Sequence, residues 1–239
     1  MNSNGITVLS LFDGMSCARI ALKELGIKVD KYYASEIDKH AIKQTMLNFP
    51  DTVQLGSVTE VDARKLGHID LLIGGSPCTN FSFAGRRNGM NTTTNEEIYT
   101  LDRYLDLKKQ GFEFDGESFL FWEYMRILGE VRETNPNVFF FLENVEMGEK
   151  WESVLTKAIG IPGVHINSAL VSAQNRRRIY WTNIKTKTEG LFGWVVPDIP
   201  QPEDRGIMLA DVLEDEVDGK YYLKDEVVDK LLANGVKGA

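Results

Sequence analysis

The sequence is poor in the residues that build disulfide frameworks and metal centres. Among its 239 residues are two cysteines, Cys17 and Cys78, and three histidines at scattered positions. Two cysteines are too few for a disulfide scaffold and are typical of a reducing compartment. None of these residues has the spacing of a zinc site, so we expect no bound metal.

Membrane spans, a secretion signal and an excess of positive charge are also missing. The chain has no apolar run near the roughly 20 residues of a membrane span, so we expect no membrane association. Its first five residues, MNSNG, do not begin a signal peptide, and we expect no secretion. The formal net charge of −8 disfavours a protein whose whole surface binds nucleic acid. Basic residues do cluster at Arg86–Arg87 and Arg176–Arg178, although such runs are commonly solvated faces.

What the sequence does contain is a regular alternation of apolar runs with helical patterns. We expect strands at Ile6–Leu11, Val29–Ala34, Ile69–Ile73, Val138–Leu142, Ile166–Val171 and Arg178–Ile184. We expect helices at Ser16–Leu25, Lys39–Asn48, Ser118–Glu133 and Trp151–Ile159. This alternation predicts an α/β fold with a doubly wound, mostly parallel sheet. The link between the last two strands is too short for a helix, so an antiparallel pair should close the sheet.

The alternation is interrupted in two places. Residues 88–117 are rich in Asn, Thr, Gly and charged residues, which predicts a long irregular segment, either functional or disordered. Beyond Lys185, glycines and prolines indicate a connector, and residues 208–239 are acidic with one or two short helices. We therefore expect a main domain over residues 1–185, followed by a connector and a further region over residues 186–239.

Cys78 is the candidate nucleophile. It follows the apolar run Ile69–Ile73 through Gly-Gly-Ser-Pro, which places it at the carboxyl end of a buried strand, where open α/β sheets bind ligands. A thiolate is a strong nucleophile, and Pro77 stiffens the approach to it. The alternative is a small core residue, because free cysteine is frequently buried.

Two segments have the features of a nucleotide-type cofactor site. Gly14 lies in the turn Leu11–Ser16 between a strand and a helix, where a cofactor can approach backbone amides. The pattern G-x-G-x-x-G is not met, which disfavours a nicotinamide or flavin cofactor. Glu36 ends the next strand about 20 residues later, the usual position of a partner for ribose hydroxyls. The alternative for Glu36 is a helix-capping charge.

Glu143 and two arginines form the remaining candidate group. Glu143 leaves the apolar strand Val138–Leu142 and could act as an acid toward a ring nitrogen. A glutamate paired to an arginine is the alternative, and it is compatible with that role. Arg176 and Arg178 should point to the same face of their strand, where two guanidinium groups can fix a carboxylate and a base carbonyl together.

Together these motifs resemble the cytosine-C5 DNA methyltransferase family. Their local sequence is most similar to that of its de novo type. The matching segments are LSLFDG at residues 9–14, ASE at 34–36, GGSPC at 74–78 with FS at 81–82, LENV at 142–145 and QxRxR at 174–178. They occur in the family's order. Any one of them is a weak signal, but five in order are specific.

The resemblance implies a class I S-adenosylmethionine-dependent fold and methylation of C5 of a flipped-out cytosine in double-stranded DNA. Cys78 would attack C6, and Glu143 would hydrogen-bond or protonate N3. Arg178 would hold the base carbonyl, and Arg176 would orient Glu143. The residues implied to contact DNA are Ser82, Arg86 and Arg87.

The resemblance also implies a site for the methyl donor, S-adenosylmethionine. Its residues would be Phe12, Asp13, Gly14, Glu36, Ile37, Ser57, Val58, Pro77 and Leu120. Family members normally have an aspartate near position 57 that holds the adenine amino group. Ser57 carries no charge, so adenine binding should be weaker.

Residues 208–239 match none of the family's C-terminal motifs, which include a target-recognition region and a segment that completes the donor pocket. The alternatives to an active enzyme are therefore a truncated or non-catalytic regulatory relative and one half of a split enzyme with a partner chain. The intact Cys78, Glu143 and Arg178 favour activity, whereas Ser57 and the unmatched region favour the alternatives. The same chemistry on RNA also stays open. A prokaryotic or viral member, for example from a restriction-modification system, would be cytoplasmic or nucleoid-associated.

Overall fold

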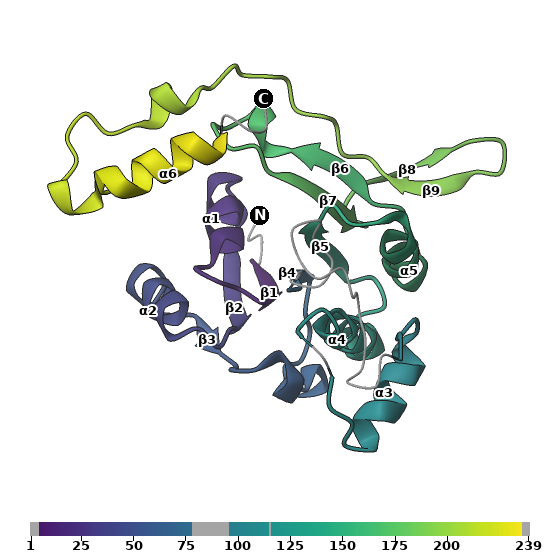
Figure 1. The fold of residues 1–239 in the computed structure, drawn as a ribbon. Coiled ribbons are helices and arrows are strands. Elements are labelled where there is room, and N and C mark those ends of the chain that lie inside the picture. Colours follow the sequence, from purple (N-terminus) through teal and green to yellow (C-terminus); the bar gives the residue numbers. More distant parts are fainter. Residues whose placement is uncertain (1–4, 78–95, 115, 236–239) are drawn as a thin grey trace. The chain divides into compact units, whose positions relative to one another are not determined.

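The structure is a computed structural model that describes residues 5–77, 96–114 and 116–235 (Figure 1). Its chain divides into two compact units. The first comprises residues 1–167 and 176–202, and the second comprises residues 168–175 and 203–239. All of the predicted site residues that the structure describes lie in the first unit.

A seven-stranded sheet forms the centre of the first unit, in the order β3-β2-β1-β4-β5-β7-β6. Its strands are β1 (Ile6–Leu11), β2 (Val29–Ser35), β3 (Val53–Gln54), β4 (Leu71–Gly75), β5 (Phe139–Val145), β6 (Val164–Asn167) and β7 (Arg177–Thr182). Strands β1 to β5 pair in parallel, and β7 runs antiparallel to both of its neighbours. The predicted doubly wound, mostly parallel sheet with a closing antiparallel pair is confirmed.

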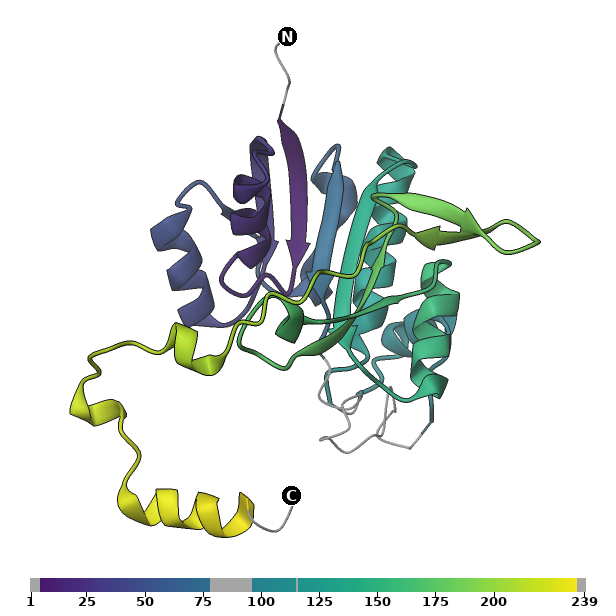
Figure 2. The ribbon, with the colours of Figure 1, turned by 90° about the horizontal axis from the view of Figure 1, so that it is seen from above.

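Helices pack on the two faces of this sheet because successive strand residues point to opposite sides. They are α1 (Cys17–Glu24), α2 (Lys39–Asn48), α3 (Leu101–Lys109), α4 (Leu120–Thr134) and α5 (Glu149–Ile159). Val8 belongs to the smaller core cluster, together with Leu22 of α1. The next residue, Leu9, belongs to the larger cluster, together with Trp122 of α4 and Trp151 of α5. The sheet is therefore covered by different helices on its two faces (Figures 1 and 2).

Three parts of the sequence-based prediction need correction. Strand β6 ends at Asn167, and residues Ser168–Leu170 form a 3-10 turn rather than the continuation expected up to Val171. Helix α3 lies inside the interval expected to be irregular. Its N-cap is Thr100, whose hydroxyl accepts a hydrogen bond from the Arg103 amide at 3.3 Å.

The third correction concerns the expected connector beyond Lys185. It contains an antiparallel hairpin of β8 (Thr186–Glu189) and β9 (Trp194–Pro197). The hairpin lies at the side of the sheet that carries α5 (Figures 1 and 2).

The second unit has little buried apolar surface. It contains α6 (Asp225–Gly235) and 3-10 turns at Leu209–Val212 and Gly219–Tyr221. Large apolar side chains along it remain exposed, among them Leu213, Tyr221, Tyr222, Leu231 and Leu232. Across the described residues of both units, no helix has the length and apolar character needed to cross a bilayer.

Candidate functional site

The turn after β1 has an unusual backbone that its surroundings hold in place. Phe12, Gly14 and Ser16 all have φ near +60°. For a residue other than glycine this conformation costs about 1–3 kcal/mol, so it persists only where contacts enforce it. The Asp13 carboxylate provides such contacts, because it accepts hydrogen bonds from the Ser16 hydroxyl at 2.5 Å and from the Tyr32 hydroxyl at 2.7 Å. Burial and the neighbouring Asp13 raise the pKa of Tyr32, which keeps its phenol protonated as the donor.

Glu36, at the end of β2, is joined to this turn by a hydrogen bond from a backbone amide, and two further amides bond to its carboxylate. Its Oε2 accepts a hydrogen bond from the Gly14 amide at 2.8 Å. Its Oε1 accepts from the amides of Ile37 and Asp38 at 2.7 and 2.9 Å. The side chain that caps α2 is that of Asp38, which accepts from the first amides of the helix. The carboxylate of Glu36 therefore stands at the mouth of the turn in a fixed orientation.

A cavity of about 250 Å³ opens beside Glu36 at the carboxyl ends of the strands. Its lining residues are Phe12, Ser35, Glu36, Ile37, Gly56, Ser57, Val58, Pro77, Glu117 and Leu120. Seven of the nine residues predicted for the donor site are among them. The other two, Asp13 and Gly14, lie in the adjoining turn, where Gly14 bonds to Glu36.

Glu117 is a lining residue that sequence reasoning missed. It adds a second carboxylate to the cavity, three residues before Leu120 on the approach to α4. Nothing in the local sequence marks it, because it lies in an interval without a recognisable pattern.

The second group of predicted residues also comes together. Glu143 lies on β5, and its Oε1 is 2.6 Å from Nε of Arg178 and 3.4 Å from Nη2 of Arg176. Opposite Glu143 on β4 is Gly75. A Cβ at this position would lie 2.8 Å from Oε2 of Glu143, so the glycine leaves the space that the carboxylate occupies.

Asn144 links β5 to the segment that leads to the candidate nucleophile. Its side chain is almost fully buried, and Nδ2 donates to Oγ of Ser76 at 2.9 Å. Asn144 thereby fixes the residue before Pro77. The sequence places Asn144 in the LENV motif but predicts no role for it. Cys78 itself, with the predicted DNA contacts Ser82, Arg86 and Arg87, lies outside the described residues.

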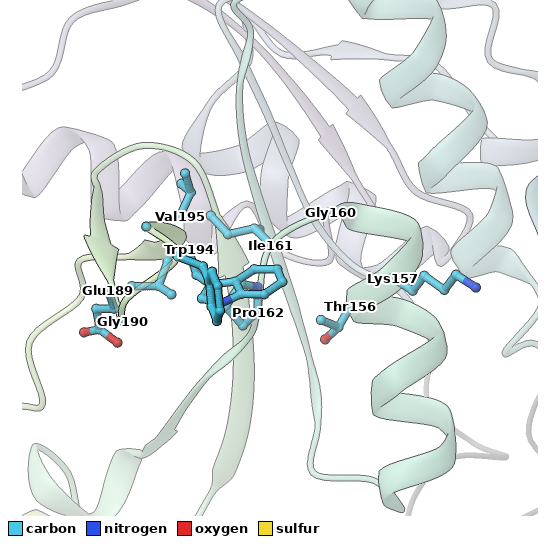
Figure 3. Close-up of a pocket in the computed structure, with 12 residues that line it drawn as sticks. Thr156, Lys157, Gly160, Ile161, Pro162, Glu189, Gly190, Trp194 and Val195 are labelled. Carbon is cyan, nitrogen blue, oxygen red and sulfur yellow. The ribbon is translucent and has the colours of Figure 1, made fainter.

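The first unit contains two further cavities of interest. One of about 690 Å³ is lined in part by Asp13, Gly75, Glu143 and Arg176, and it shares Phe12 with the smaller cavity. Phe12 therefore stands between the space beside Glu36 and the space beside Glu143. A larger cavity of about 930 Å³ lies between the end of α5 and the hairpin, and none of the predicted site residues lines it (Figure 3). Among the described residues, no group of His, Cys, Asp or Glu side chains could hold a metal ion.

Comparison with known sequences identifies relatives of this chain. Residues 6–110 match the family described as C-5 cytosine-specific DNA methylase. The chain is 29% identical to the orphan methyltransferase M.Rho11sI of Bacillus phage rho11s, over 95% of the chain and 47% of that protein. It is 30% identical to the type II methyltransferase M1.ScrFI of Lactococcus lactis subsp. cremoris, over 93% of the chain and 52% of that protein. The chain thus spans about half the length of these curated relatives.

Solved structures share its fold. A variant of Spodoptera frugiperda DNMT2 superposes with a TM-score of 0.64 at 18% identity, over 95% of this chain and 65% of that one. The Dnmt2 methyltransferase of S. pombe superposes with a TM-score of 0.61 at 17% identity, over 96% and 66%. Residues 6–110 thus match the C-5 cytosine-specific DNA methylase family, the relatives in sequence are methyltransferases, and the solved structures share the fold of this chain.

Proposed function

We propose that the protein transfers a methyl group from S-adenosylmethionine to C5 of a flipped-out cytosine in double-stranded DNA. The observation that carries this proposal is the convergence of seven predicted donor-site residues on one cavity, with Phe12 between it and the Glu143 group. A methyl donor and a base bound on the two sides of Phe12 would be neighbours.

The cavity beside Glu36 has the groups that S-adenosylmethionine requires. The Glu36 carboxylate suits the ribose hydroxyls, and three amide bonds hold it in place. The apolar side chains of Phe12, Val58 and Leu120 suit the adenine ring. Ser57 offers the ring a hydroxyl where related proteins offer an aspartate. When bound, the donor supplies an electrophilic methyl group.

On the other side of Phe12, the protein would make cytosine C5 nucleophilic. The Cys78 thiolate would form a bond to C6, which breaks the aromaticity of the ring and leaves C5 electron-rich. Glu143 would hydrogen-bond or protonate N3 and so stabilise the charge that develops on the ring. Arg178 would hold the base carbonyl, and Arg176 would orient Glu143. After methylation, loss of the C5 proton would break the bond between C6 and Cys78. The base must leave the stack for this attack, and Ser82, Arg86 and Arg87 would contact the DNA around it.

Covalent trapping tests this proposal. A C5 fluorine cannot leave as a proton, so DNA with 5-fluorocytosine at the target should remain attached to Cys78. We expect a denaturation-resistant adduct that requires S-adenosylmethionine, and no adduct with Cys78→Ala. Methylation of ordinary duplex DNA without any adduct on the fluorinated duplex would contradict the mechanism.

A second candidate is a catalytic half that requires a further C-terminal region, supplied by the same protein or by a partner chain. The observation that favours it is that the chain spans about half of its curated relatives. The net charge of −8 also leaves few anchors for phosphates. We expect residues 1–239 alone to incorporate little tritiated methyl into duplex DNA and to gain activity when a C-terminal half is added. Robust, site-specific incorporation by the isolated chain would rule this candidate out. In either case we expect the protein to act where bacterial or phage DNA is found, in the cytoplasm or nucleoid.

A further inference from the structure

One wall of the cavity beside Glu36 is held from outside by Arg126, a partly buried arginine whose side chain is 15% exposed. Ser57 and Val58 line the cavity, and they begin the 3-10 turn Val58–Glu60. Arg126 of α4 donates from Nη2 to the carbonyl of Val58 at 3.1 Å and from Nη1 to the carbonyl of Val61 at 2.9 Å. A single guanidinium group therefore bridges the two ends of the turn.

Arg126 is itself fixed by carboxylates on its own helix. Its Nε donates to Glu123 at 2.7 Å, and its Nη1 donates to Glu130 at 2.6 Å. The Glu123 side chain is fully buried, and it also accepts from the Tyr104 hydroxyl and the Lys108 ammonium, both at 2.5 Å. The arginine thus has little freedom to leave the two carbonyls.

The cost of burying these charges indicates a role beyond packing. Replacing a buried ion pair with apolar residues is often neutral or stabilising, so stability alone does not require the pair. Arg126 donates to its two carboxylate partners and also to two carbonyls of the cavity wall. Lys108 also bonds to this wall, because its Nζ lies 3.4 Å from the carbonyl of Thr59 in the same turn. Leu120, which lines the cavity, precedes Glu123 by three residues on α4, so one helix supplies both a wall and its anchor.

We infer that Arg126 is a positioning residue for the methyl donor, which holds Ser57 and Val58 in their binding arrangement before the donor arrives. A preformed wall avoids the entropy loss of ordering a loop at the moment of binding, and this raises affinity. The inference rests on the proposed function and deepens it.

The test compares two arginines that both contact Glu130. Arg126→Met removes the bonds to the Val58 and Val61 carbonyls. Arg64→Met is the control, because Arg64 pairs with Glu130 and Glu133. Titration calorimetry with S-adenosylhomocysteine should give a Kd about tenfold higher for Arg126→Met, as expected when hydrogen bonds of a charged group are lost. Arg64→Met should stay within about twofold of the unsubstituted protein, because the Arg64 side chain is half exposed and exposed charges contribute little.

Two further measurements separate positioning from general destabilisation. S-inosylhomocysteine, which has an oxo group in place of the adenine amino group, should bind more weakly than S-adenosylhomocysteine to the unsubstituted protein. In Arg126→Met this discrimination should shrink, whereas a merely structural defect would weaken both ligands equally. Hydrogen exchange without any ligand should accelerate at residues 57–63 in Arg126→Met and not in Arg64→Met.

Arg126→Lys provides the conservative variant. A lysine keeps the charge beside Glu123 but cannot serve both carbonyls and both carboxylates, so we expect an intermediate Kd. It also carries the test should Arg126→Met not fold. Unchanged affinity for S-adenosylhomocysteine in a folded Arg126 variant would overturn the inference and leave the proposed function standing. Failure of the unsubstituted protein to bind S-adenosylhomocysteine would overturn both.

Discussion

The proposed donor side of the site, beside Glu36, and the proposed base side, beside Glu143, hold their central carboxylates in different ways. On the donor side, Glu36 accepts three hydrogen bonds from the backbone amides of Gly14, Ile37 and Asp38. Two of these amides belong to the residues that follow it directly. The orientation of Glu36 is therefore set mainly by the local chain, with one bond to the turn after β1.

On the base side, Glu143 is held by charged side chains from another strand. Arg178 and Arg176 reach it from β7 and the residue before it, and the space it occupies exists because Gly75 of β4 has no side chain. This arrangement forms only when β4, β5 and β7 pair in the correct register.

The comparison predicts that substitutions on the two sides have separable effects. Changes on the base side should lower the rate of methyl transfer and leave donor affinity nearly unchanged. Changes on the donor side should raise the Kd for the donor and leave the rate at saturation nearly unchanged.

The largest effect is expected from Cys78→Ala. It should abolish methyl transfer, because no other group would form the bond to C6 that activates C5. Calorimetry with S-adenosylhomocysteine should give an unchanged Kd, because the thiol acts only on the base. Residual transfer above that of a protein-free control would exclude Cys78 as the nucleophile.

Glu143→Gln should have the next largest effect. The substitution keeps the shape but removes the titratable proton, so transfer should slow by the roughly 10²–10⁴-fold typical of a general acid. The matched control is Glu146→Gln, a nearby carboxylate that pairs with His165 and Arg177. Single-turnover incorporation of tritiated methyl at saturating DNA measures both. Equal rates for the two variants would mean that Glu143 is merely structural.

Gly75→Ala tests whether the space opposite Glu143 matters. The new Cβ would lie 2.8 Å from Oε2, so the carboxylate must shift, and we expect transfer to fall by about tenfold or more, as displacements near 1 Å can cost up to 10²-fold. Gly129→Ala in α4 is the control. Its Cβ would meet no atom of the described residues within 4 Å, apart from its chain neighbours and its own helix backbone. A Gly75→Ala protein as fast as the control would show that Glu143 tolerates displacement.

Glu36→Gln should affect binding rather than rate. The amide group of glutamine cannot accept all three backbone hydrogen bonds and carries no charge for the ribose hydroxyls. We expect the Kd for S-adenosylhomocysteine to rise about tenfold, in line with the loss of a charge-assisted hydrogen bond. The transfer rate at saturating donor should stay close to that of the unsubstituted protein. A fall in that rate with unchanged Kd would reverse the assignment of the two sides.

Much of the fold could be predicted from the sequence because its elements follow local patterns. The observed bounds of β1 and α2 are those predicted from the sequence, Ile6–Leu11 and Lys39–Asn48. Helix α3 was missed because charged residues dominate it and only one narrow face, with Tyr104 and Leu107, is buried. The hairpin was missed because its glycines and prolines are equally typical of a connector.

The candidate site could be predicted in part for the same reason. Glu36 and Glu143 lie in short motifs at strand ends, where chemistry can be recognised from neighbouring residues. The bond from Arg126 to the Val58 carbonyl joins residues 68 positions apart, and the bond from Asn144 to Ser76 spans the same separation. No local pattern encodes such pairs, because they arise from the order in which strands and helices pack.

The smallest expected effect concerns stability near the base side. His165 of β6 places Nε2 2.9 Å from Glu152 and Nδ1 3.4 Å from Glu146. Burial lowers the pKa of His165, but the two carboxylates outweigh it, and the pKa in the folded protein is raised above its ordinary value. A raised pKa stabilises the fold fully below the ordinary value of about 6.5 and loses that contribution as pH rises through the folded value. The gap in Tm between the unsubstituted protein and His165→Gln should therefore be widest near pH 5.5 and narrow toward pH 8.5, which is the range in which histidine titrates.

Because His165 lines neither cavity beside Phe12, the rate of methyl transfer should not change in this variant. A constant gap in Tm would contradict the ion pairs, and a slower transfer would extend the base side to β6.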